Sequence, residues 1–157
     1  MKRFILFIIV FYISLSFSVV YSQDDPLIVI TGSVNNENYE KLSGVKVEIK
    51  QDNLVFKCVV TNSNGKYDPI EIPFGHIYII SFSKNDFATK SILIDSKTGY
   101  FKEEHFTQPF AFPITLLSKQ PNVDYSVVSD QHVGKIRIID GNLDLDNIYN
   151  KQRKNKE

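Results

Sequence analysis

Short runs of alternating apolar and polar residues recur between residues 27 and 117, separated by clusters of Gly, Asn, Asp and Pro. A side-chain period of two is typical of a β-strand with one buried and one solvated face. The runs predict strands at 27–34, 45–49, 54–61, 77–82, 88–95 and 110–117, and a short extended piece from Pro69 to Pro73. Because half-polar strands favour antiparallel pairing, the sequence predicts an all-β, antiparallel β-sandwich of about seven strands.

Residues that favour turns stand between the predicted strands. Asn62-Ser63-Asn64-Gly65 predicts a tight turn with Gly65 in the left-handed conformation, and a second turn is predicted at Lys84-Asn85-Asp86. Pro113 interrupts the run 110–117 and cannot donate a ladder hydrogen bond. We therefore expect that strand to lie at a sheet edge or to be bulged there. Residues 96–108 are polar and irregular, and are expected to form a loop.

The N-terminal residues have the charge order of a secretory signal. Two basic residues precede an apolar stretch at 4–20, and Val20 and Ser22 place small side chains before Gln23. We expect cleavage after Ser22. The alternative is an uncleaved anchor, although the stretch is short of the about 20 apolar residues that a bilayer requires. Contact with a membrane is thus expected only if the signal is retained.

Removal of the signal, residues 1–22, leaves a chain long enough for one hydrophobic core. The pattern divides it into a sandwich at 23–118, a C-terminal extension with extra strands at 119–150 and a charged tail at 151–157. The 18 basic and 18 acidic side chains balance, and the signal contains only basic ones, so the mature part is slightly acidic. No nucleic-acid partner is expected. The protein is expected in the periplasm, at the cell surface or secreted.

The chain has a single cysteine, Cys58, so no intrachain disulfide can form. Leu54, Phe56, Cys58 and Val60 alternate, which predicts that Cys58 is a buried core residue. A reactive or intermolecular thiol is the alternative.

Four segments have a more specific spacing than the strands alone. They are Thr31-Gly32-Ser33-Val34, Leu42-Ser43-Gly44-Val45-Lys46-Val47, Thr61-Asn62-Ser63-Asn64-Gly65-Lys66-Tyr67 and Ile72-Pro73-Phe74-Gly75-His76-Ile77-Tyr78. This series resembles the transthyretin-like β-sandwich of carboxypeptidase regulatory-like domains and of many exported bacterial proteins. The resemblance implies a fold, which can host many functions. Independently of it, Gly44, Gly65 and Gly75 suit chain reversals, and Tyr67 and Tyr78 can bury a ring while the hydroxyl is hydrogen-bonded.

Enzyme sites known in that family have no counterpart here. The resemblance implies a possible hydroxyisourate hydrolase, but residues 27–34 contain no titratable side chain and the last residues are not the Tyr-Arg-Gly-Ser of that enzyme. His76, His105 and His132 are far apart and lack a metal-ligand spacing, and there is no zinc pair or serine-nucleophile motif. We expect no catalytic residues and no cofactor.

Two other kinds of site, a calcium loop and an isopeptide cross-link, have partial signals in the sequence. Asp140, Asn142, Asp144 and Asp146 alternate as at the start of a calcium loop, but the turn glycine and the closing glutamate are missing, so a strand or turn is favoured. An isopeptide cross-link from Lys46 or Lys50 is disfavoured because both alternate with the apolar residues of their strand.

Aromatic residues gather around the loop 96–112, and Tyr100 and Phe101 are weak candidates for stacking on sugars. Packing of these rings into the core is favoured over this alternative. The sequence therefore predicts a non-enzymatic exported module with a structural or protein-binding role, whose partner is a protein or a cell-envelope glycan. The alternatives are a carbohydrate-binding module and, third, a small hydrolase with an unrecognised site.

Overall fold

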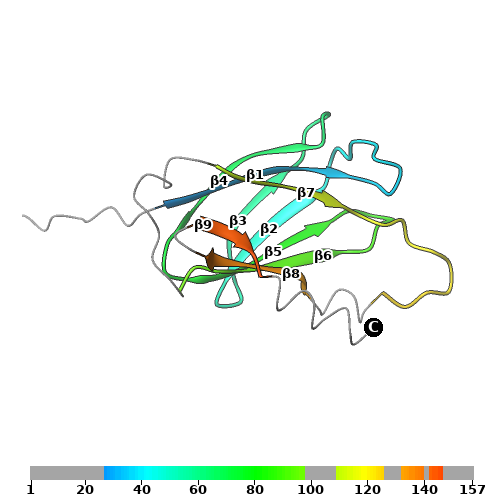
Figure 1. Cartoon of the computed structure of the whole chain (residues 1–157). Coiled ribbons are helices and arrows are strands. Elements are labelled where there is room, and N and C mark those ends of the chain that lie inside the picture. Colours follow the sequence, from blue (N-terminus) through cyan, green and yellow to red (C-terminus); the bar gives the residue numbers. More distant parts are fainter. Residues whose placement is uncertain (1–26, 98–108, 126–131, 140–141, 147–157) are drawn as a thin grey trace, which may run out of the picture.

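The computed structural model describes residues 27–97, 109–125, 132–139 and 142–146, which form a two-layered β-sandwich (Figure 1). These residues contain nine strands and no helix. The strands are β1 (Leu27–Asn35), β2 (Lys46–Gln51), β3 (Leu54–Val60), β4 (Lys66–Pro73), β5 (Ile77–Ser83), β6 (Lys90–Asp95), β7 (Phe110–Thr115), β8 (His132–Ile139) and β9 (Asn142–Leu145). The predicted all-β sandwich is thus confirmed.

The smaller sheet has the strand order β4-β1-β7, and the larger has the order β3-β2-β5-β6-β8-β9. Both sheets are mixed, because β1 pairs with β7 and β6 pairs with β8 in parallel. The expectation of purely antiparallel pairing is wrong for these two pairs. Alternation of side chains indicates which face of a strand is buried, but not the direction in which a neighbouring strand runs. The many residues between β6 and β8 allow β8 to return parallel to β6.

The core lies between the sheets and is formed by the inward side chains of both. It includes Ile28, Ile30, Val34, Val47, Ile49, Tyr67, Ile70, Ile72, Tyr78, Ile80, Phe82, Ile94, Ile114, Leu116 and Ile136. The two tyrosine rings are buried as predicted. The Tyr78 hydroxyl donates to the Pro73 carbonyl oxygen at 2.8 Å, whereas the Tyr67 hydroxyl has no hydrogen-bond partner among the described residues. The expectation of a hydrogen-bonded hydroxyl is therefore met by Tyr78 alone.

The predicted turns are present. Gly44, Gly65 and Gly75 all have positive φ. At Gly65 the φ is 68° and a Cβ atom would lie 2.6 Å from the Val34 carbonyl oxygen, so a larger residue would be strained there and would also clash. The turn at 84–86 is also observed, with Asp86 in the left-handed region.

Thr61, directly after β3, fixes that end of the strand to the core. Its buried hydroxyl donates to the Leu42 carbonyl oxygen at 2.7 Å and accepts from the Val45 N–H at 2.9 Å. Two buried backbone groups are satisfied by one side chain, which joins the start of β2 to the end of β3.

Pro113 lies on β7, an edge strand of the smaller sheet, as predicted. On its inner side β7 approaches β1 closely at Gly32, where a Cβ atom would lie 2.3 Å from the Phe112 carbonyl oxygen. A side chain at position 32 would push these two strands apart, which explains the glycine there.

Cys58 is exposed, so the prediction that it is buried is wrong. Residues opposite each other in an antiparallel pair share a face, and Cys58 is opposite Glu48 whereas Val59 is opposite the buried Val47. Val59 is therefore the inward residue of this pair of neighbours. The run Leu54–Val60 is apolar at both alternating sets of positions, so its pattern does not determine which set faces the core.

The C-terminal part of the described chain extends the larger sheet. Ile136 and Ile138 of β8 are buried, and Ile136 joins the core between the sheets. β9 then pairs antiparallel with β8 and forms the far edge.

Candidate functional site

The outermost strand of the larger sheet, β3, exposes an unusual number of apolar side chains. We define the β3 edge by Leu54, Val55, Phe56, Cys58 and Val60, all of which are exposed. Leu54 has 75% and Val60 59% of its surface accessible. Apolar residues scattered singly over a surface are ordinary, but a contiguous apolar edge strand marks a surface suited to a partner.

The backbone of β3 also has hydrogen-bonding groups directed away from the sheet. Thr61 donates its N–H to the Val45 carbonyl oxygen at 3.0 Å, toward β2. Successive residues of an antiparallel strand direct these groups to alternate sides. The N–H and C=O groups of Cys58 and Val60 therefore face the open side of β3, where a further strand would pair.

Charged residues lie next to the β3 edge on the solvent face of β2. Glu48 accepts a hydrogen bond from Lys46 and lies 3.3 Å from the Lys50 ammonium nitrogen. The hydrogen bond from Lys46 lowers the pKa of Glu48 and raises that of Lys46. The side chains of both lysines reach solvent, as their alternation with the apolar residues of the strand predicted.

The opposite end of the larger sheet has a different surface chemistry. Lys135 of β8 lies 3.0 Å from the Asp95 carboxylate of β6, and Arg137 lies 3.4 Å from Asp146. Asp95 and Asp146 are both buried, so these two ion pairs are better shielded from water than the pairs of Glu48.

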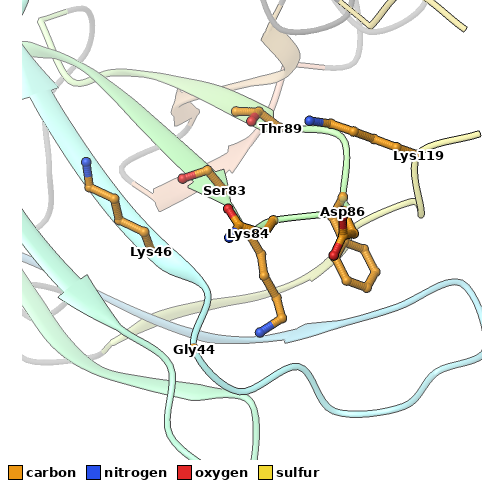
Figure 2. A pocket seen from close by; sticks show the side chains of 9 residues that line it. Gly44, Lys46, Ser83, Lys84, Asp86, Thr89 and Lys119 are labelled. Carbon is orange, nitrogen blue, oxygen red and sulfur yellow. The ribbon is translucent and has the colours of Figure 1, made fainter.

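A basic pocket of about 570 Å³ lies at the turn between β5 and β6 (Figure 2). It is lined by Gly44, Lys46, Ser83, Lys84, Asn85, Asp86, Phe87, Thr89 and Lys119. Figure 2 shows Lys84 extending toward Gly44 and Lys119 extending toward Thr89. The Lys84 ammonium donates to the Ser43 carbonyl oxygen at 2.7 Å.

The two described histidines, His76 and His132, do not form a site together. His76 lies 3.0 Å from the Gln51 side-chain nitrogen near the Asp95 end of β6, whereas His132 lies 2.9 Å from the Ser91 hydroxyl at the start of that strand. Burial lowers the pKa of His132. His105 lies outside the described residues. No group of three or more His, Cys, Asp or Glu side chains suited to a metal ion occurs within the described ranges.

Some of the other predicted site residues lie in the described part of the chain and some lie outside it. Asn142 and Asp144 belong to β9, and Asp146 follows it, as the strand alternative to a calcium loop predicted. Asp140, Tyr100 and Phe101 lie outside the described residues, as do residues 1–22 and 151–157. Of the nearby aromatics, Phe110 and Phe112 pack against the core, and the Phe112 ring lies 6.3 Å from that of Phe82.

Sequence reasoning missed both the β3 edge and the basic pocket. The sequence did contain an indication of the β3 edge. Six of the seven residues of Leu54–Val60 are apolar, which is more than a strand with one solvated face requires. The sequence contained no indication of the basic pocket. Lys84 and Lys119 are distant in sequence and are brought together by the backbone bonds from Ala88 N–H to Leu117 O and from Lys119 N–H to Asp86 O, each 2.8 Å.

No protein-family model matches this chain, and no curated protein is similar to it. Distant structural matches are found among solved proteins. A 3-chlorocatechol 1,2-dioxygenase from Rhodococcus opacus 1CP is 9% identical over 63% of this chain and 62% of its own, with a TM-score of 0.45. The wild-type catechol 1,2 dioxygenase of Acinetobacter radioresistens is 15% identical over 72% of this chain and 59% of its own, with a TM-score of 0.48.

A third match is the Bacillus anthracis TIE protein, 18% identical over 59% of this chain and 17% of its own, with a TM-score of 0.41. The chain thus spans about three fifths of the length of the two dioxygenases. These distant matches assign no family. Within the described residues, no helix is long and apolar enough to span a membrane.

Proposed function

We propose that this protein is a non-enzymatic, exported β-sandwich module that binds a partner protein by strand addition at the β3 edge. The observation that carries the proposal is the coincidence, on one strand, of exposed apolar side chains and outward-directed backbone groups. In strand addition, main-chain hydrogen bonds supply affinity and alternate side chains supply specificity. Both are available on β3.

The occupant is an extended, acidic segment of another protein. Lys57 is exposed on β3, and Lys46 and Lys50 lie on β2 next to it, so a partner strand with carboxylates complements the local charge. A second copy fits less well. A twofold pairing centred at Lys57 would place the two Lys57 ammonium groups opposite each other, and one centred at Cys58 would place them diagonally. Repulsion between like charges disfavours both pairings.

Export and the transthyretin-like family are part of this proposal. The signal pattern at 1–22 and the spacing of the turn glycines support them, and the sandwich fold is consistent with the family. Mass spectrometry of the protein recovered after expression of the full chain in a bacterial host tests export. We expect a mature N-terminus at Gln23 in the exported fraction, whereas a full-length chain in the cytoplasm would contradict it.

The binding test uses a soluble peptide of alternating Val and Glu residues as the probe strand, with the alternating Val and Lys peptide as its charge control. We expect the Val–Glu peptide to bind the purified protein, as measured by fluorescence anisotropy, and the Val–Lys peptide to bind at least tenfold more weakly. Val60→Glu places on the β3 edge a charge of the same sign as the carboxylates of the probe and should weaken its binding at least tenfold.

The matched control is Leu145→Glu, which places the same charge at the opposite edge of the same sheet, where Leu145 is 47% exposed. It should leave binding unchanged. Equal effects of the two substitutions, or no effect of Val60→Glu, would contradict strand addition at β3. Self-association in sedimentation runs that Val60→Glu abolishes would instead identify the occupant as a second copy.

A further inference from the structure

The basic pocket at the turn between β5 and β6 has a framework of backbone hydrogen bonds. Ala88 and Lys119 donate to the carbonyl oxygens of Leu117 and Asp86, and Phe87 and Ser118 form an isolated bridge. The turn and the segment after β7 are therefore held together by main-chain contacts. This pairing fixes the backbone from which Asp86, Phe87 and Lys119 line the pocket.

The pocket has an excess of positive charge. Of its three lysines, Lys46 shares the Glu48 carboxylate with Lys50. Within the described ranges, neither Lys84 nor Lys119 has a carboxylate within ion-pair distance. The Lys84 ammonium uses one N–H on the Ser43 carbonyl oxygen and has two further donors. Two ammonium groups are thus available to a ligand that carries a carboxylate or a phosphate.

The other polar groups favour a ligand that also has hydroxyls. Asp86 presents a carboxylate, which would repel a bare anion but accepts hydrogen bonds from sugar hydroxyls. Ser83 and Thr89 can donate and accept, and Asn85 can do both through its amide. Phe87, partly buried against the core, adds an apolar wall against which a sugar ring can pack.

We propose that this pocket binds an acidic saccharide, a sugar unit carrying a carboxylate or phosphate group. The volume of about 570 Å³ lies within the range of about 300 to 1,000 Å³ typical of small-ligand sites. Lys119 and Lys84 hold the anionic group, and Asp86 accepts from the hydroxyls. Lys46 borders both this pocket and the β3 edge, so the two proposals are tested by substitutions at other residues.

The experiment measures calorimetric binding of the full protein to three probes: a uronic-acid disaccharide, the neutral disaccharide of the same linkage, and inorganic phosphate. We expect the acidic disaccharide to bind at least tenfold more tightly than either of the others. Lys119→Gln should weaken its binding about tenfold, since it removes a charge-assisted hydrogen bond. The control is Lys66→Gln, an exposed lysine at the start of β4 that does not line the pocket and whose loss should leave binding unchanged.

Asp86→Asn separates this proposal from plain anion binding. Loss of the carboxylate should strengthen phosphate binding and weaken binding of the acidic disaccharide, because a strong acceptor for its hydroxyls is lost. Three results would overturn the proposal: no binding of the disaccharide at millimolar concentration, equal binding of the neutral disaccharide, or equal losses for Lys119→Gln and Lys66→Gln. Circular dichroism of each variant verifies that the fold is retained.

Discussion

The two ends of the larger sheet differ in where their apolar side chains lie. At one end, β3 exposes apolar side chains, and its backbone groups face outward at Cys58 and Val60. At the other end, β8 lies beside the edge strand β9 and directs Ile136 and Ile138 into the interior, and ion pairs join its Lys135 and Arg137 to neighbouring carboxylates. The charged residues differ as well, because β3 has one, Lys57, whereas the edge strand β9 carries Asp144 and lies beside the two ion pairs of β8.

The difference shows that apolar content alone does not indicate a strand's role. Ile136 of β8 belongs to the core and Val133 packs against it, so these apolar residues stabilise the sandwich. Those of the β3 edge remain exposed to water, where they contribute little to stability, and we infer that binding is their use. The comparison can therefore be tested by substituting equivalent residues at the two ends.

The largest expected effect is on stability at the β8 end. Ile136 has 1% of its surface exposed, so Ile136→Ala should lower the free energy of unfolding by about 3 kcal/mol through lost burial and a residual cavity. The matched change on β3, Leu54→Ala, should lower it by less than about 0.5 kcal/mol. Urea unfolding followed by circular dichroism measures both, and similar losses would contradict the contrast between the edges.

A smaller effect is expected from the ion pair between β6 and β8. Asp95→Asn leaves the Lys135 ammonium without this carboxylate and should cost about 1 kcal/mol, a loss that shrinks in 1 M salt. Glu71→Gln, at an exposed position of β4, serves as the control and should cost less than about 0.5 kcal/mol. A salt-independent loss at Asp95 would indicate that its role is not electrostatic.

The smallest effect concerns pH. Burial lowers the pKa of His132 below its ordinary value of 6.5, so the unfolded chain binds a proton more readily than the folded one. The stabilisation is fully present above pH 6.5 and should be lost as the pH falls through the folded-state pKa. Urea unfolding between pH 7.5 and pH 5 should show this slope in the wild type. His132→Asn should reduce it, and an unchanged slope would contradict the assignment to His132.

The sequence predicted the parts of the fold that depend on local chemistry. Gly65 marks a turn because of its φ, and Pro113 marks an edge because it has no N–H. The prediction that Cys58 faces the core was wrong because the residues of β3 are apolar at nearly every position, so alternation does not identify the inward side chains. Parallel pairing of β8 with β6 depends on contacts between distant segments, for which no local signal exists.

The candidate sites were harder to predict for the same reason. The β3 edge depends on which strands cover β3, and the basic pocket depends on hydrogen bonds that join residues 84–89 to residues 117–119. In contrast, the absence of a recognisable metal-ligand spacing among the histidines was evident from the sequence. It agrees with the separation of His76 and His132 along β6.

Backbone amide hydrogen exchange at β3 tests the central claim most directly, because it reports whether the outward N–H groups are free to pair with another strand. In the purified protein we expect the amides of Cys58 and Val60 to exchange rapidly and those of Lys57 and Val59, which face β2, to be protected. Addition of the Val–Glu peptide should then protect Cys58 and Val60. Protection of all four amides before any peptide is added would show that the β3 edge is already covered, and would contradict the account.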